Sequence, residues 1–428
     1  MSSTARRSRE RGANGSTKSD PGEFGSVEDW LASLRSTGRI GALLAPTRED
    51  QIARGYGHTL REICQQPVTW LETAALLPER RGSLERALDR VGAVVLTGSG
   101  SSLYAGECVA PSLQEGLRVP VTAVPGGLIL THPTSCLPPS GPYLVVSLAR
   151  SGNSPESRGV VDWLAENQPQ ARHLFITCNR HGALSTSYGS RPGTLTIVLD
   201  EKTDDKSLVM TSSFTNLVLA ARGLGAEPAP AGIQRSVLPL ARAAGGILRE
   251  RADDVAAAAS GDFGSAVFLG SGCRLGSARE AALKMLEMNA GEVWTLSESY
   301  LGLRHGPMSA VRPDTLVVAF LSSDPVVRAY EVDLLRELRR KGLGARRLIV
   351  GSDVPGELAA SPEDVAVDCG KAPALADEDL TVIDALVGQL LAFFRCVAAG
   401  FRPDSPSEQG VITRVVSDFE IHRRDGAV

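Results

Sequence analysis

The stretch that decides the fold is Val94-Val-Leu-Thr-Gly-Ser-Gly-Ser-Ser102, in which a β-branched run leads directly into a turn of glycine and serine. The same pattern returns at Val267-Phe-Leu-Gly-Ser-Gly272, which indicates an internal duplication of one α/β unit. A strand that enters such a turn and then a helix presents backbone N–H groups and hydroxyls at a helix N-terminus, a common geometry for holding a phosphate. We therefore expect a phosphorylated ligand.

Composition narrows the class of protein. The chain has 428 residues, 43% of them hydrophobic, which is enough for two or three domains with their own cores. A net charge of −4 offers no broad basic surface, so we expect no nucleic-acid partner and no anionic membrane surface as a partner. By our reading no apolar run approaches a membrane span, and residues 1–27 lack the apolar core of a secretory signal.

Cysteine usage bears on the compartment. The seven cysteines are scattered and show neither a Cys-x-x-Cys pair nor a zinc-ligand spacing. We expect buried, reduced thiols, no metal, and a cytoplasmic protein.

The chain divides into five predicted parts. Residues 1–26 are rich in glycine, serine and arginine and are expected to be a disordered extension, because they cannot bury enough apolar surface. A helical segment follows over residues 27–89. The first α/β domain is predicted over 90–227 and the second over 240–400, with Pro228 and Pro230 marking the seam. Residues 401–428 are predicted to form an extended C-terminal arm.

Strands and helices alternate in both predicted domains. The expected strands are 94–97, 143–147, 173–178 and 195–199, and then 266–269, 316–321, 347–350 and 365–367. The clearest helices are expected at 157–166, 278–289, 326–341 and 380–399. This alternation is typical of an α/β fold, a doubly wound parallel sheet with helices on both faces, present here twice.

A second anion-binding loop is predicted at Arg150-Ser-Gly-Asn-Ser-Pro-Glu-Ser157, which follows the second predicted strand of the first domain. Ser154 suits a helix N-cap and Pro155 the first helical position, so Ser151 and Ser154 are placed to face an anion. With Ser101 and Ser102 they would form a cradle of two loops at the carboxyl edge of the sheet. Either loop alone is more often explained by turn and capping chemistry, and it is the presence of two such loops on successive strands of one sheet that favours a phosphate.

The second domain differs at the matching strand end. There the chain reads Ser322-Ser-Asp-Pro325, which puts a carboxylate, Asp324, where an anion would bind. We therefore expect that the second domain has lost the phosphate site.

The second domain carries other candidates for chemistry. Glu280, Lys284 and Glu287 fall on one helix face, although such a triplet is also typical of a solvated salt-bridge stripe. His305, in Arg304-His-Gly-Pro307, is a candidate proton shuttle, while a lone histidine can equally be structural or merely exposed.

Taken together, the motifs of residues 57–416 resemble the double sugar-isomerase (SIS) domain family. They are Gly98-Ser-Gly-Ser-Ser102, Ala149-Arg-Ser-Gly-Asn-Ser-Pro-Glu-Ser157, Met210-Thr-Ser-Ser-Phe-Thr215, Glu280-Ala-Ala-Leu-Lys284 with Glu287, Leu303-Arg-His-Gly-Pro307 and Ser322-Ser-Asp-Pro325. The most similar branch is the galactosamine-6-phosphate deaminase/isomerases, also described as tagatose-6-phosphate ketose/aldose isomerases. The resemblance implies two tandem SIS domains, each a flavodoxin-like parallel sheet.

The resemblance also assigns roles to residues. It extends to the isomerase halves of glucosamine-6-phosphate synthases, and it implies Glu287 as the base for proton transfer between sugar carbons 1 and 2, with Lys284 near the sugar. His305 matches a histidine of ring opening that comes there from the neighbouring subunit, which implies a homodimer with a shared site. The implied substrate and phosphate contacts are Gly100, Ser101, Ser102, Arg150, Ser151, Ser154 and Ser212. The synthases' Schiff-base lysine has no counterpart in residues 411–424, where Arg414 is the nearest cation.

The implied activity is that of an amino-sugar 6-phosphate deaminase/isomerase acting on galactosamine 6-phosphate or glucosamine 6-phosphate. Enolisation beside an imine needs a base and a fixed acid, so we expect no cofactor. Two alternatives stay open, namely aldose/ketose isomerisation without release of ammonia and a sugar-phosphate sensor without catalysis.

Overall fold

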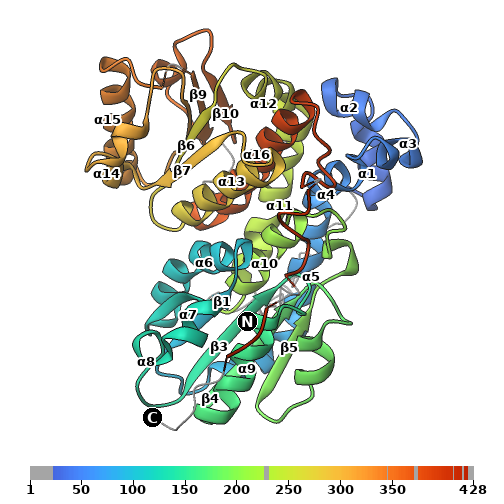
Figure 1. The fold of residues 1–428 in the computed structure, drawn as a ribbon, viewed down its shortest axis with the longest axis vertical. Helices are drawn as coiled ribbons and strands as arrows, with labels where there is room; N and C mark the ends of the chain where they lie inside the picture. The colour runs from blue at the N-terminus through green and yellow to red at the C-terminus, as the bar shows by residue number, and fades with distance from the viewer. Residues whose placement is uncertain are drawn as a thin grey trace, which may run out of the picture.

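The chain folds into two α/β lobes that lie one above the other (Figure 1). The computed structural model describes residues 23–225, 231–344, 346–370, 375–407, 409–416 and 419–422. Most of the extension predicted over residues 1–26, and the seam prolines Pro228 and Pro230, lie outside these ranges. Where the description begins, Phe24 is buried and packs edge-on against Trp30.

Each lobe is built on a parallel sheet of five strands, and the two sheets share one topology. The front sheet has the order β2-β1-β3-β4-β5, made of β1 (Val94–Gly98), β2 (Val121–Pro125), β3 (Tyr143–Ala149), β4 (Ala171–Thr177) and β5 (Thr194–Val198). The rear sheet has the order β10-β9-β8-β6-β7, made of β6 (Ser265–Leu269), β7 (Trp294–Glu298), β8 (Leu316–Phe320), β9 (Arg346–Gly351) and β10 (Val365–Asp368). Read in chain order both are 2-1-3-4-5, the flavodoxin-like arrangement, so the predicted fold class is confirmed.

Two strands were missed by the sequence prediction, and they occupy equivalent places. β2 and β7 are each the edge strand beside the first strand of their sheet. Their sequences, Val-Thr-Ala-Val-Pro and Trp-Thr-Leu-Ser-Glu, have no continuous apolar run because their burial is only partial. The central strands β1, β3, β6 and β8 are buried at every position, which is why apolar runs revealed them.

Helices cover the sheets and join the lobes. The N-terminal segment holds α1 (Val27–Leu34), α2 (Gly38–Leu44), α3 (Arg48–Ala53), α4 (Gly57–Cys64) and α5 (Gln66–Leu88). The front lobe adds α6 (Ser101–Leu117), α7 (Gly126–Thr131), α8 (Pro133–Cys136), α9 (Pro155–Asn167) and α10 (Ser212–Arg222). Two further helices, α11 (Ala231–Gly246) and α12 (Ala252–Ala259), lead to the rear lobe, which adds α13 (Arg274–Met288), α14 (Tyr300–Leu303), α15 (Pro325–Arg340) and α16 (Asp377–Ala398).

The lobes meet where α13 of the rear lobe packs on α6 of the front lobe. The approach is close at Gly276, where an added Cβ would lie 2.7 Å from the backbone nitrogen of Cys108. Beside it, the Cys108 thiol lies 3.5 Å from the Ser277 hydroxyl. This contact brings the start of α6, which follows the first glycine-serine turn, next to the rear lobe.

Helix α16 corrects one sequence expectation. Residues 377–398 are long and apolar enough to cross a membrane by length and composition, whereas we expected no such run. In the fold, 89% of the most apolar window of α16 is buried inside the protein, where it packs on α13 and α12. Its apolar composition therefore reflects a core position.

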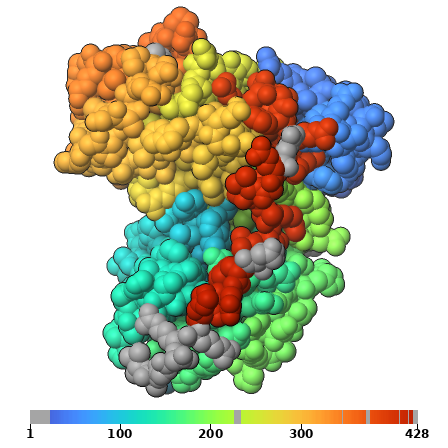
Figure 2. Space-filling model, viewed as in Figure 1, coloured from blue at the N-terminus to red at the C-terminus, as the bar shows by residue number. Residues whose placement is uncertain are grey.

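The C-terminal arm, here the described residues between 401 and 422, crosses from the rear lobe to the front lobe and lies on its surface (Figure 2). Asp404 fixes its beginning, because the carboxylate accepts hydrogen bonds from the backbone N–H groups of His58 (3.1 Å) and Thr59 (2.7 Å) at the start of α4. Farther along, Ile421 lies where a Cβ on Gly159 of α9 would meet it at 3.0 Å.

Candidate functional site

The first predicted phosphate loop sits between β1 and α6. Gly100 has φ +56° and ψ −129°, a conformation that favours glycine, and Ser101 and Ser102 then open the helix. Both serines are largely buried, with 5% and 7% of their surface exposed. The turn therefore directs hydroxyls and helix N–H groups to the carboxyl edge of the front sheet.

The second predicted loop sits between β3 and α9, and its helix start has the expected form. The Ser154 hydroxyl accepts a hydrogen bond from the Ser157 N–H (3.2 Å), and Pro155 is the first helical residue. The Asn179 side chain donates to the Ser151 carbonyl (3.1 Å) and so fixes the loop. Because β1 and β3 are neighbours at the point where the strand order reverses, the two loops lie at one edge of the sheet.

The rear lobe delivers charged side chains to the first loop. The Lys284 ammonium donates to the Ser101 hydroxyl at 3.0 Å and lies 2.5 Å from the Glu287 carboxylate. On its other side it lies 3.3 Å from the Glu280 carboxylate. Three predicted site residues, Ser101, Lys284 and Glu287, are thereby brought together from two lobes. The triplet is not a solvated stripe, because Glu280 and Lys284 are fully buried.

Burial shapes the protonation of this cluster. Burial of Glu280 raises its pKa to about 7, and the Glu287 charge adds to that effect against the opposing charge of Lys284. Burial alone would lower the pKa of Lys284, but the charges of Glu280 and Glu287 outweigh it and raise the pKa. Lys284 is therefore a cation held beside Glu287, whose side chain is 22% exposed and so reachable by a ligand.

The Glu280 carboxyl predicts a measurable pH dependence of stability. Its pKa rises from 4.5 to about 7 on folding, so the stability it contributes is fully present below about pH 4.5 and is lost as the pH rises through 7. We expect Glu280→Gln, which cannot titrate, to gain in Tm relative to the unchanged protein between those pH values. Thermal melts across pH 4 to 8 test this, with the exposed Glu292→Gln as control, and parallel profiles for Glu280→Gln would contradict it.

His305 lies apart from this cluster. It is exposed in the turn between α14 and the helical turn Pro307–Ala310, and its N–H donates to the Gly302 carbonyl at 3.0 Å. Among the described residues, no hydrogen bond or ion pair joins the His305 ring to Glu287 or to the phosphate-loop serines. Within one chain, then, His305 is not assembled with the other candidates.

Arg150 and Ser212 are both occupied by the protein itself. The Arg150 side chain donates to the carbonyls of Leu208 (3.0 Å) and Arg414 (2.5 Å). Ser212 is fully buried at the start of α10 and donates to the Asp205 carboxylate at 2.5 Å. A direct contact of either side chain with a ligand therefore stays a prediction, and in this structure the hydroxyl of Ser212 helps to hold α10.

The rear lobe has filled its own version of the cradle. The Asp377 carboxylate accepts hydrogen bonds from the Ser322 hydroxyl (2.5 Å), the Ser323 N–H (2.6 Å) and the Ser323 hydroxyl (3.0 Å). Asp324, which we expected to block the anion, instead caps α15 through the N–H groups of Val326 and Val327. An internal carboxylate thus occupies the donors of this loop, although it is a different one from that expected.

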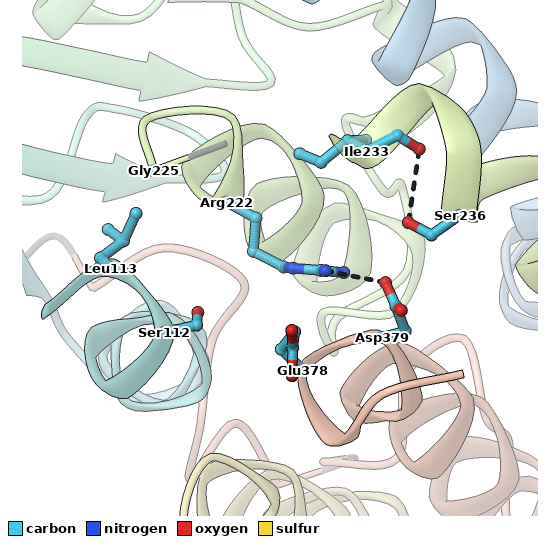
Figure 3. Close-up of a pocket in the computed structure, with 8 residues that line it drawn as sticks. All are labelled: Ser112, Leu113, Arg222, Gly225, Ile233, Ser236, Glu378 and Asp379. Carbon is cyan, nitrogen blue, oxygen red and sulfur yellow. Dashed lines mark hydrogen bonds and ion pairs between the residues drawn. The ribbon is translucent and has the colours of Figure 1, made fainter. Parts of the chain in front are cut away.

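A cavity of about 230 Å³ lies elsewhere, at the far end of α6 (Figure 3). Its lining comes from α6, α10, α11 and α16, and it includes the ion pair between Arg222 and Asp379 (2.7 Å). It contains none of the predicted site residues, so it is separate from the candidate site.

Sequence reasoning missed several residues that support the site. Asp205 and Asp377 carry no local signal, because their partners are distant in sequence or lie in irregular turns. Arg274 could have been found, since it follows the second glycine-serine turn where the first copy has Ser102. Arg274 is completely buried, and its charge is already paired with the Asp384 carboxylate, 2.5 Å away.

Comparisons with known proteins identify relatives of this chain in sequence and in fold. The D-galactosamine-6-phosphate deaminase AgaS of Escherichia coli is 33% identical over 375 residues, which cover 85% of this chain and 95% of that protein. A relative from Streptomyces coelicolor, to which the same name is given provisionally, is 37% identical with the same coverage. The crystal structure of tagatose-6-phosphate ketose/aldose isomerase from Escherichia coli superposes with a TM-score of 0.76 at 32% identity, covering 83% of this chain and 96% of that one. No family model matches the chain.

Proposed function

This chain belongs to the double-SIS sugar-isomerase family of these deaminases and isomerases, and we propose that it is an amino-sugar 6-phosphate deaminase/isomerase. The proposed reaction converts galactosamine 6-phosphate, or glucosamine 6-phosphate, to a ketose 6-phosphate and ammonia. The single observation that carries the proposal is the contact of Lys284 with both Ser101 and Glu287, which sets a carboxylate close to a phosphate loop.

The two ends of the substrate would be held by different lobes. Ser101 and Ser102 of the first loop and Ser151 and Ser154 of the second would bind the phosphate, each charge-assisted hydrogen bond contributing about 1.5–3 kcal/mol. The sugar would then extend toward α13. There the Lys284 ammonium can stabilise oxygen that gains negative charge during proton transfer.

Glu287 is the proposed base. After ring opening, its carboxylate takes the proton from carbon 2 of the aldehyde form and returns it to carbon 1 through an enolamine. The product is a ketimine at carbon 2, and addition of water then releases ammonia and leaves the ketose. Electrons and protons balance in this sequence without an oxidant or a reductant.

Turnover and product analysis tests the proposal. The protein is incubated with galactosamine 6-phosphate and with glucosamine 6-phosphate, and ammonia and ketose 6-phosphate are assayed separately. Both products in equal amounts support the proposal and identify the sugar. An isomerised amino sugar without ammonia would contradict deamination and indicate an isomerase. Binding of the sugar phosphate without any product would indicate a sensor that lacks catalysis.

We further propose a homodimer in which His305 reaches the site of the partner subunit. Its support is that His305 is exposed and unconnected to Glu287 within one chain. Large apolar side chains also lie exposed on the elements around the site: Leu286 of α13 (39%), Trp294 of β7 (50%) and Leu301 of α14 (47%). Exposed apolar groups of this size are typical of a surface that a partner covers.

Mixed subunits test the shared site. We expect His305→Asn and Glu287→Gln proteins to be weakly active alone and to regain up to about one quarter of full activity after subunit exchange, because half of the exchanged dimers are mixed and each holds one intact site. Mixing either variant with itself is the control. No recovery, with exchange verified by mass, would contradict the shared site.

A cytoplasmic location is proposed as well. All seven cysteines are free thiols, and six of them are buried. Unpaired cysteines in this number are typical of a compartment that keeps thiols reduced.

A further inference from the structure

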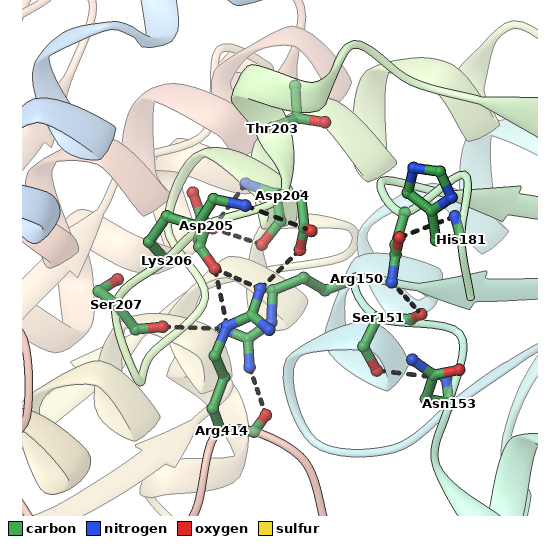
Figure 4. A network of polar contacts seen from close by, with 12 residues as sticks. Arg150, Ser151, Asn153, His181, Thr203, Asp204, Asp205, Lys206, Ser207 and Arg414 are labelled. Carbon is green, nitrogen blue, oxygen red and sulfur yellow. Dashed lines mark hydrogen bonds and ion pairs between the residues drawn. The ribbon is translucent and has the colours of Figure 1, made fainter.

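The C-terminal arm contacts the second phosphate loop where Arg150 meets Arg414 (Figure 4). Arg150, the residue before Ser151, is 7% exposed and donates through Nη2 to the backbone carbonyl of Arg414 at 2.5 Å. Its Nη1 donates to the carbonyls of Leu208 (3.0 Å) and Ser207 (3.4 Å). Among the described residues no carboxylate lies within ion-pair distance of Arg150, so its buried charge is held by carbonyl oxygens.

The side chain of Arg414 holds its own carbonyl in place. Nη2 lies 2.6 Å from the Asp204 carboxylate and Nε donates to the Asp205 carbonyl at 2.9 Å. The Arg414 side chain therefore binds the loop of residues 204–210, while the Arg414 carbonyl accepts a hydrogen bond from Arg150. Among the described residues, the contacts of the Arg414 side chain are the ones that keep the Arg414 carbonyl beside the Arg150 guanidinium.

The loop of residues 204–210 is a firm anchor and reaches the first phosphate loop too. Glu62 of α4 accepts hydrogen bonds from the Ser207 N–H (3.2 Å) and from the Ser207 hydroxyl. Asp205 accepts from the Thr211 N–H (2.8 Å) at the start of α10. At its other end Met210 lies 3.9 Å from the Ser102 hydroxyl. One loop thus contacts a residue of each phosphate loop.

We propose that Arg414 is a positioning residue for the phosphate end of the substrate: it holds Arg150, and through it the loop that begins at Ser151, in the geometry that binds a phosphate. The physical reason is the conformational entropy of the Arg150 side chain, which has many rotamers when it is free. When Arg414 already holds the Arg150 guanidinium beside the loop, phosphate binding costs no further loss of that side-chain freedom. The inference rests on the proposed function only in taking phosphate as the anchored group.

Arg414→Gln tests the proposal, because it removes the Asp204 contact and keeps the length of the arm. We expect the Kd for inorganic phosphate, measured by calorimetry, and the KM for the sugar phosphate to rise about tenfold, with kcat changed less than twofold. Arg339→Gln is the matched control. Arg339 also binds one carboxylate, Asp364, and two main-chain carbonyls, but it lies on the rear lobe.

Further variants separate positioning from general stability. Arg414→Lys, which can still pair with Asp204, should recover most of the phosphate affinity, and Asp204→Asn should weaken it as Arg414→Gln does, with no added loss in the double variant. A fall in Tm equal to that of Arg339→Gln, with the phosphate Kd unchanged, would overturn the proposal. Because phosphate binding is measured without turnover, absence of deamination would count against the proposed function and leave this test intact.

Discussion

Glu287→Gln is expected to reduce the turnover of an amino-sugar 6-phosphate by about 10²–10⁴-fold, the usual contribution of a positioned general base. The amide keeps the size of the side chain and can still contact Lys284, which lies 2.5 Å from the carboxylate. It cannot accept the proton from carbon 2. In the proposed site the phosphate is bound by the serines of the front lobe, so the Kd for inorganic phosphate should change less than twofold.

Steady-state kinetics measure the turnover, and calorimetry on the same preparation measures the Kd for inorganic phosphate. Glu292→Gln, at an exposed position just after α13, is the control for loss of a negative charge near the site, and it should retain full turnover. Turnover by Glu287→Gln within threefold of the unchanged protein would remove Glu287 from the role of base. If phosphate binding and turnover are both lost, Glu287 would instead have a structural role in stabilising the fold.

Asp384→Asn is expected to lower the free energy of unfolding by about 3–5 kcal/mol, the usual cost of leaving a buried charge without its partner. Arg274 is completely buried, and Asp384 binds it with both carboxylate oxygens, at 2.7 and 2.5 Å. Asp377 is 3.8 Å away and is already held by Ser322 and Ser323, so it cannot replace Asp384. Urea unfolding followed by circular dichroism measures the change.

Two further variants serve as controls for the Asp384→Asn measurement. Replacing both partners, as Arg274→Met with Asp384→Leu, should recover much of the lost stability, because apolar groups of similar volume need no counter-charge. Glu357→Gln breaks a solvent-exposed ion pair with Arg336 and should cost less than about 1 kcal/mol. A loss below about 1 kcal/mol for Asp384→Asn would show that the rear turn does not depend on this pair.

The Asp384→Asn prediction concerns a difference between the two duplicated domains. The front turn continues Gly100-Ser101-Ser102 and keeps small hydroxyl side chains, whereas the rear turn continues Gly272-Cys273-Arg274. Gly272 has a φ of +55°, close to the +56° of Gly100. The glycine turn is therefore present in both copies, and in the rear copy it leads into a buried ion pair between Arg274 and Asp384.

The local features were predictable because their causes are local. Buried strands appear as β-branched runs, Ser154 and Pro155 mark a helix start by their own chemistry, and Gly100 is required by its backbone angle. The two copies of one pattern were enough to predict two parallel sheets. The edge strands β2 and β7 were not predicted, because both are partly exposed and polar residues interrupt their apolar sequence.

The sequence by itself thus determined the fold class, the duplication and the two serine loops. Only the tertiary structure decided which distant polar groups meet: Lys284 with Ser101, 183 residues away, the Ser322 hydroxyl with the Asp377 carboxylate, and Arg150 with the carbonyl of Arg414 in the arm. The physical reason is that backbone conformation depends on neighbouring residues, whereas the energy of a charge depends on its burial and on the distance to its partners. Those quantities are set by the packing of α13 on α6 and by the path of the arm, which no local pattern contains.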